Sequence, residues 1–187
     1  MTKLVNILWF DDDFEHAPLR VKLWTRWFEA QKSKFKLIPA GTIVDFARAL
    51  ELRAKCARTD ADYIDAILLD VMLRVPSTAD FAVLGFSKTK WLALDAGAQV
   101  LGLMKNTGFN NDRPDFLKNY VDRPTALLTS QTTVKETWSK FVEHGVRNNE
   151  QQVGVLIKGS VVAHAQSEPS QDFRDWLNGI ATKGSPK

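Results

Sequence analysis

Four short apolar runs in this chain each end in acidic, hydroxyl or lysine residues. The runs cover residues 5–10, 66–69, 126–128 and 155–157, and they lead into Asp11, Asp70, Thr129 and Lys158 respectively. Short continuous apolar runs with polar ends are typical of parallel strands that are covered on both faces. Because the carboxyl ends of such strands meet at one edge of the sheet, we expect these polar residues to surround one crevice.

Between the runs, apolar residues recur at helical spacing, which predicts that strands and helices alternate. Such alternation requires right-handed crossovers and therefore a parallel sheet between two layers of helices. We expect a fifth strand at 35–40. A capping box of Thr42 and Asp45 opens one helix, and Pro18 fits only the first turn of another. The expected helices are 14–32, 42–52, 92–105, one that opens with a capping box at 133–136, and 172–180.

The length of 187 residues suits one domain with elaborations. The single cysteine, Cys56, cannot form an internal disulfide, and the first residues lead into a strand rather than a signal peptide. No apolar stretch approaches the roughly 20 residues of a membrane span. We therefore expect a cytoplasmic protein without a membrane partner. The net charge of +3 comes from basic residues spread along the chain, so nucleic-acid binding is not indicated.

The expected crevice would hold acids, a hydroxyl and one lysine. Paired aspartates suit Mg²⁺, which takes oxygen ligands and completes its shell with water and phosphate. A further aspartate can attack phosphorus and form an acyl phosphate, while the metal, the ammonium and the hydroxyl neutralise the phosphoryl oxygens. The residue types therefore favour phosphoryl transfer.

The four runs and their polar ends resemble, in their order along the chain, the receiver domains of two-component response regulators. These ends are, in order, Asp11 with Asp12 and Asp13, then Asp70, then Thr129 with Ser130, and finally Lys158. The resemblance covers most of residues 3–181. It implies a flavodoxin-like, doubly wound, five-stranded parallel sheet with helices on both faces. It also implies a phosphoprotein that works in a phosphorelay for signal transduction.

Carried over residue by residue, the resemblance makes Asp70 the phosphoacceptor. Asp12 would be a direct Mg²⁺ ligand and Asp11 an outer acid that holds metal-bound water. Asp70 itself and the backbone carbonyl of Met72 would complete the protein's ligands, and Asp13 would be a secondary acid of the site.

The remaining site residues would handle the phosphoryl group. Thr129 matches the switch hydroxyl, Lys158 matches the lysine that pairs with a phosphoryl oxygen, and Ser130 occupies the small position beside the site. The implied partners are a histidine kinase or phosphotransferase and an unknown output protein, and a homodimer stays open. The only turnover expected is self-phosphorylation and self-dephosphorylation.

Several positions depart from the family pattern. Gly159 stands where the family follows its lysine with proline, and Val155 stands where many members carry an aromatic residue. The region 74–123 reads as an insertion of two extended loops that flank a helix. No effector region follows the last helix, so we expect a single stand-alone domain over 1–187.

Other interpretations stay open at this point. The acids from Asp11 to Asp13 could cap a helix, and Asp70 could be a turn residue. The departures also suit a pseudo-receiver that binds partners without phosphorylation. A third hypothesis is a haloacid dehalogenase-like phosphatase with Asp11 as nucleophile and Asp13 as acid, which leaves Asp70 unexplained.

Overall fold

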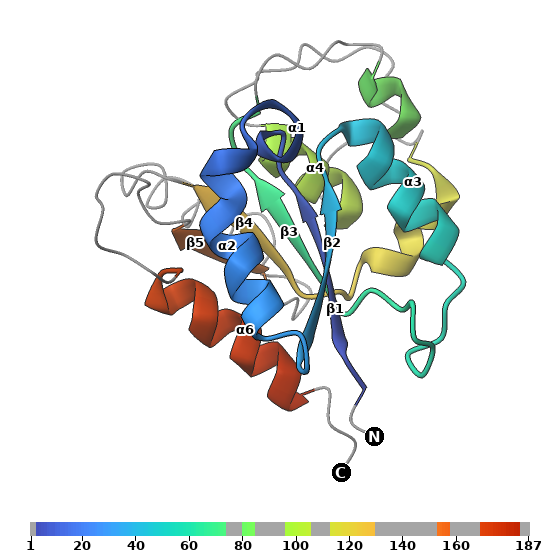
Figure 1. Ribbon diagram of the computed structural model, residues 1–187. Helices are drawn as coiled ribbons and strands as arrows, with labels where there is room; N and C mark the ends of the chain where they lie inside the picture. Colours follow the sequence, from blue (N-terminus) through green and yellow to red (C-terminus); the bar gives the residue numbers. More distant parts are fainter. Residues whose placement is uncertain are drawn as a thin grey trace.

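The structure of the protein, a computed structural model, describes residues 3–73, 80–84, 96–105, 113–129, 153–157 and 169–183. Its centre is a five-stranded sheet with the order β2-β1-β3-β4-β5 (Figure 1). Every neighbouring pair is parallel, so the expected doubly wound sheet is confirmed. The strands are β1 (Val5–Phe10), β2 (Phe35–Ala40), β3 (Ala66–Asp70), β4 (Thr125–Thr129) and β5 (Val153–Ile157).

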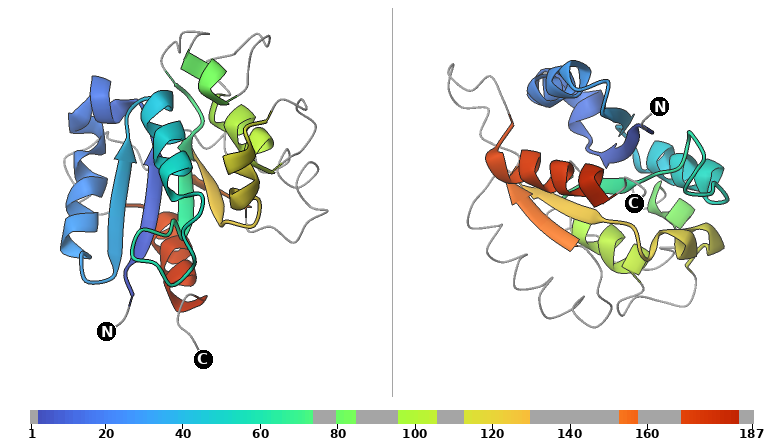
Figure 2. Two further views of the ribbon diagram at one scale, coloured as in Figure 1. Left: turned by 90° about the vertical axis from the view of Figure 1, so that its right-hand side faces the viewer. Right: turned by 90° about the horizontal axis from the view of Figure 1, so that it is seen from below.

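Helices cover both faces of this sheet, as the views of Figure 2 show. The described α-helices are α1 (Asp13–His16), α2 (Pro18–Ala30), α3 (Ile43–Arg53), α4 (Ala96–Lys105) and α6 (Gln171–Lys183). There are also two 3₁₀ segments, η1 (Asp80–Leu84) and η3 (Asp115–Tyr120). The segment η1 contacts α3, and η3 contacts both α3 and α4. None of the helices among the described residues is long and apolar enough to cross a membrane.

The continuous apolar strands divide their side chains between two cores because successive residues of a strand point to opposite faces. Leu8 and Phe10 of β1 belong to the core that contains α3 and α4. Ile7 and Trp9 belong to the core that contains α2 and α6. A strand buried on both faces needs apolar residues at every position, which explains why the strand runs do not alternate.

The helix expected over 14–32 is wrong as a single element. The chain breaks at Ala17, whose φ of −149° and ψ of 61° are not helical, and Pro18 begins α2. Proline disfavours the helical conformation of the residue before it, so a separate short helix precedes the break. The capping box is confirmed, because Thr42 Oγ1 accepts a 3.0 Å hydrogen bond from the N–H of Asp45.

Other expected elements differ mainly at their ends. The helix expected over 92–105 is described from Ala96, and the last helix extends to Lys183. The helix expected from 133 lies outside the described residues. The expected loops of 74–123 include the 3₁₀ segments η1 and η3, which bury Leu84, Leu117 and Tyr120.

Candidate functional site

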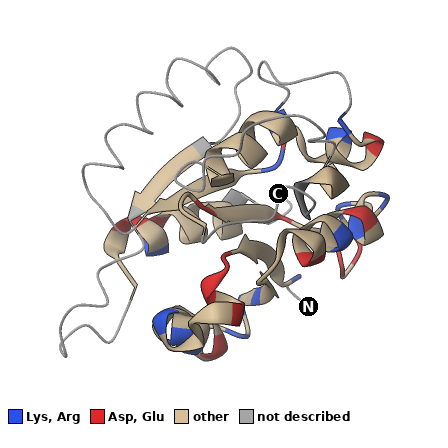
Figure 3. Ribbon diagram, turned by 90° about the horizontal axis from the view of Figure 1, so that it is seen from above, with Lys and Arg blue, Asp and Glu red and all other residues tan. Residues whose placement is uncertain are grey.

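The strand register brings the predicted site residues to the same edge of the sheet. Phe10 of β1 pairs with Leu69 of β3, so Asp11 and Asp70 follow at the same level on neighbouring strands. Asp70 pairs with Leu128 of β4, and Thr129 is the next residue. Figure 3 looks down onto this edge, where acidic positions lie at the end of β1. The convergence expected for Asp11, Asp70 and Thr129 is therefore present.

The carboxylates at this edge are unusually buried. Asp11 exposes none of its surface, Asp12 exposes 8%, and Asp70 exposes 7%. One ligand oxygen from each of Asp11, Asp12 and Asp13 lies within 4.8 Å of the others. Burying several carboxylates this close together is costly unless positive charge or hydrogen bonds compensate. This arrangement therefore favours a cation in the crevice.

Local hydrogen bonds explain part of the acidic turn. The N–H of Asp13 donates to Asp11 Oδ1 over 3.0 Å, which closes the turn that leaves β1. Asp12 occupies the N-cap position of α1, but its side chain makes no capping hydrogen bond. Arg20 of α2 places Nη1 4.0 Å from Asp13 Oδ1. The turn therefore accounts in part for Asp11, and capping of α1 does not account for Asp12.

Sequence reasoning missed a close packing contact at Asp70, the predicted phosphoacceptor. A Cβ on Gly97 would lie 2.0 Å from the carbonyl oxygen of Asp70 and 3.2 Å from Cα of Val71. The N–H of Gly97 also donates to the carbonyl of Val71 over 3.4 Å. The first turn of α4 is thus packed directly on the backbone of Asp70. The available signal was the run of small residues Ala96, Gly97 and Ala98, which are all buried.

The second half of the site is described only as far as the strands reach. Thr129 is 2% exposed at the end of β4, and Met72 lies 36% exposed just beyond β3. Lys158, Ser130 and Gly159 lie outside the described residues. Lys158 directly follows Ile157, which pairs with Thr129 across β4 and β5. The placement of Lys158 at this edge stays a prediction.

The described acidic residues at this edge of the sheet fit a divalent cation. Hard oxygen ligands from Asp11 and Asp12, with Asp70 on the neighbouring strand, are the donor set that Mg²⁺ prefers. A carboxylate nucleophile beside such a cation and a hydroxyl can accept a phosphoryl group without any acid or base of special pKa. The arrangement is suited to phosphoryl transfer to Asp70.

Comparisons with known proteins find solved structures that are similar to this chain. No family model matches the chain, and no curated protein matches it in sequence. A solved bacteriophytochrome response regulator is similar in structure, with 15% identity and a TM-score of 0.51 over 97% of this chain and 92% of the other. A response regulator receiver domain from Rhodospirillum rubrum has 17% identity and a TM-score of 0.39 over 96% and 91% of the two chains.

The first of these similarities, together with the strand order, shows that the chain has the fold of a response regulator receiver domain. The fold expected from the ordered Asp, Asp, Thr and Lys residues is therefore confirmed. At these sequence identities the similarity concerns the fold, and the chemistry has to be argued from the site itself.

Proposed function

We propose that the protein is a response regulator receiver that accepts a phosphoryl group on Asp70 in a Mg²⁺-dependent reaction. The observation that carries this proposal is the register of β1, β3 and β4, which sets the nearly buried Asp70 between the acidic turn and Thr129. A lone buried aspartate would have a simpler structural explanation. Buried acids on two neighbouring strands, beside a buried hydroxyl, instead require one explanation that accounts for all of them together.

Each residue has a stated role in the proposal. An oxygen of Asp70 attacks phosphorus, the bond from phosphorus to the donor's leaving atom breaks, and the leaving group departs with the electron pair; the leaving atom is an imidazole nitrogen in a phosphohistidine and an oxygen in acetyl phosphate. Asp11 and Asp12 would hold the Mg²⁺, which neutralises phosphoryl oxygens when bound. The hydroxyl of Thr129 donates to one phosphoryl oxygen, and the ammonium of Lys158 pairs with another. Ser130 would lie beside the site, and the backbone carbonyl of Met72 would complete the ligands.

The phosphorylated and unmodified forms would differ in their contacts with a partner. Moving a two-state equilibrium requires only that the phosphoryl group interacts differently with the two conformations. The phosphoryl donor would be a histidine kinase or phosphotransferase, and the target would be an output protein. The protein would act as one receiver-like domain over 1–187 in the cytoplasm, with 74–123 as an elaboration.

The test is the intact mass of the protein after incubation with acetyl phosphate and Mg²⁺. We expect a gain of one phosphoryl group that hydroxylamine removes, because hydroxylamine cleaves acyl phosphates. The gain should be absent in Asp70→Asn and in the presence of a chelator. Asp115→Asn, an equal change at an exposed acid of η3, serves as the control and should retain the gain. A gain that persists in Asp70→Asn would overturn the assignment.

A pseudo-receiver is the second candidate, and one observation favours it. Val155 is a half-buried aliphatic residue that packs against the core of α3 and α4, where many receivers carry an aromatic switch residue. If no phosphodonor modifies the protein, we infer instead that it binds partners without being phosphorylated. Turnover of free phosphate esters that is lost in Asp11→Asn would instead indicate a haloacid dehalogenase-like phosphatase.

A further inference from the structure

A groove of about 430 Å³ lies away from the acidic crevice, between α2 and the edge strand β2. Its floor is apolar and includes Phe28 of α2 together with Phe35, Leu37 and Pro39 of β2. Lys32, Lys36 and one acid, Glu29, line its rim, and all three are exposed. The residues of the groove take no part in the proposed phosphoryl chemistry.

One wall of the groove is a free strand edge in the described part of the sheet. The carbonyls of Lys34 and Ala40 accept hydrogen bonds from β1, so the even-numbered residues direct their backbone groups inward. The odd-numbered residues direct theirs outward, because backbone direction alternates along a strand. Leu37 therefore presents both an N–H and a carbonyl at this edge, whereas Pro39 presents a carbonyl alone.

The stretch of the chain that forms most of the groove is basic. Residues 18–38 contain six lysines and arginines and one acid, Glu29, a net charge of +5. The whole chain carries +3, so the other residues together carry −2. Five of the six cations are exposed, and Lys34 is half-buried. The groove is thus formed largely by a stretch of the chain that carries net positive charge, and Lys32 and Lys36 of this stretch line the groove together with Glu29.

We propose that this groove binds an extended acidic segment of a partner protein. The segment would pair with the outer edge of β2 through the backbone of Leu37, place apolar side chains against the accessible side chains of Leu37 and Pro39, and set its carboxylates near Lys32 and Lys36. Extended peptides commonly add to a free strand edge in this way, with backbone hydrogen bonds for affinity and pockets for alternate side chains. Pro39 limits the pairing to the first part of the strand, which also protects the edge from unrestricted strand addition.

A protein segment fits the observations better than a nucleic acid or a membrane surface. A nucleic acid is held mainly by phosphate contacts and needs basic or aromatic groups along its path. Here an apolar floor and strand-edge groups lie between the two rim lysines. Lys36 already has Asp62 as an exposed ion partner 3.3 Å away, and such a surface pair is weak enough to exchange for a partner's carboxylate.

The experiment uses a dye-labelled ten-residue peptide that alternates glutamate with valine and isoleucine, titrated with the full chain by fluorescence anisotropy. The double variant Lys32→Glu with Lys36→Glu should weaken binding about tenfold or more. The matched control, Arg48→Glu with Lys55→Glu, makes the same charge change at exposed positions away from the groove and should change binding less than about twofold. Equal weakening by both variants would show that only net charge matters and would overturn the proposal.

Backbone amide shifts provide the second measurement, because they locate the peptide. Addition to the β2 edge should shift the amides of Leu37 and its neighbours, and a lysine-for-glutamate peptide should cause no shift. Shifts confined to other elements would overturn the proposal. A single-stranded oligonucleotide or vesicles of anionic phospholipid that bind while the acidic peptide does not would overturn it in favour of those ligands.

Discussion

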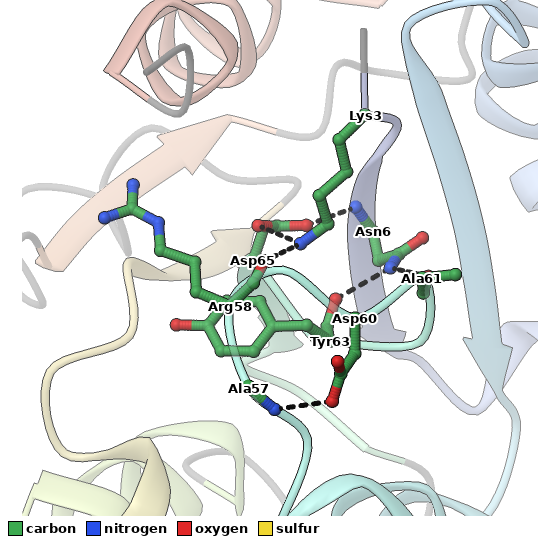
Figure 4. Close-up of polar contacts among 8 residues, drawn as sticks. All are labelled: Lys3, Asn6, Ala57, Arg58, Asp60, Ala61, Tyr63 and Asp65. Atoms are coloured by element: carbon green, nitrogen blue, oxygen red, sulfur yellow. Dashed lines mark hydrogen bonds and ion pairs between the residues drawn. The ribbon is translucent and has the colours of Figure 1, made fainter. Parts of the chain in front are cut away.

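At the carboxyl edge of the sheet the buried carboxylates of Asp11, Asp12 and Asp13 lie close to one another, whereas at the amino edge the buried amide of Asn6 donates to backbone carbonyls (Figure 4). Asn6 of β1 donates from Nδ2 to the carbonyls of Ala61 and Tyr63, both over 2.7 Å. Asp65 accepts from the N–H of Asn6 over 2.9 Å and pairs with Lys3. These contacts fix the segment that enters β3.

The helix α4 connects the two edges. Its first turn packs on Asp70, and its last residue, Lys105, is 1% exposed at the opposite end. Lys105 Nζ donates to the carbonyls of Val121 and Arg123, over 2.7 and 2.6 Å. The Arg123 guanidinium in turn lies 4.0 Å from the centre of the Tyr63 ring. The donors of Asn6 and Lys105 at the amino edge thus have backbone carbonyls as acceptors, whereas the carboxyl edge gathers carboxylates that can bind a cation.

The largest effect on this comparison should come from Gly97. Gly97→Ala places a methyl group 2.0 Å from the carbonyl oxygen of Asp70. Because the contact is with backbone and not with a flexible side chain, relieving it requires α4 or the end of β3 to shift. We expect a loss of about 3 kcal/mol or more in the free energy of unfolding, together with loss of phosphoryl acceptance. Urea denaturation measures the first effect and intact mass the second.

Gly179 of α6 is the matched control for Gly97. A Cβ at Gly179 meets no atom within 4 Å, so Gly179→Ala should stabilise the helix by about 0.5–1 kcal/mol. Similar destabilisation by both substitutions would show that the contact between α4 and Asp70 does not limit the free energy of unfolding.

The fold was predictable from sequence because local patterns determine it. The run 5–10 and the capping box at Thr42 each describe one element, and the order of polar strand ends gives the shared edge. The contact of Gly97 with Asp70 was not predicted, because the small residues Ala96, Gly97 and Ala98 indicate close packing but do not indicate the partner, which lies far away in the chain. Likewise, helical periodicity gives no reason to bury Lys105, whose acceptors are carbonyls of the segment after η3.

The second prediction tests the amino edge. Asn6→Ala removes two buried hydrogen bonds and leaves the carbonyls of Ala61 and Tyr63 without this donor. We expect a loss of about 2–3 kcal/mol in the free energy of unfolding, with phosphoryl acceptance per folded molecule unchanged. Asn119→Ala, at an exposed amide, should cost less than about 0.5 kcal/mol. Loss of acceptance in folded Asn6→Ala would mean that the edges are not separable.

The third prediction concerns pH and Lys105. Burial lowers the pKa of Lys105 from 10.5 to about 8, against the opposing field of Asp122. Between these values the unfolded chain binds more protons than the folded one, so this group makes stability rise as pH rises through the window. Relative to Lys105→Met, the native protein should gain about 2 kcal/mol between pH 7 and pH 9.5.

Urea denaturation of both proteins across that range measures the gain. Burial raises the pKa of Tyr120, so this group lowers stability only as pH rises above the usual tyrosine range, and it is present in both proteins. A constant difference between the two proteins from pH 7 to pH 9.5 would show that Lys105 keeps an ordinary pKa in the fold.

The smallest expected effect lies at the acidic turn, where function and stability should oppose each other. Asp12→Asn removes one of three clustered negative charges while keeping the shape of the side chain. In metal-free buffer we expect the free energy of unfolding to increase by about 1 kcal/mol, because repulsion within the cluster falls. Millimolar Mg²⁺ should stabilise the native protein and have little effect on Asp12→Asn, since a ligand stabilises only the fold that binds it. Thermal unfolding with and without Mg²⁺ measures both effects. If Asp12→Asn instead destabilises the metal-free protein, the acids of this edge are held by internal partners, as the polar groups of the amino edge are.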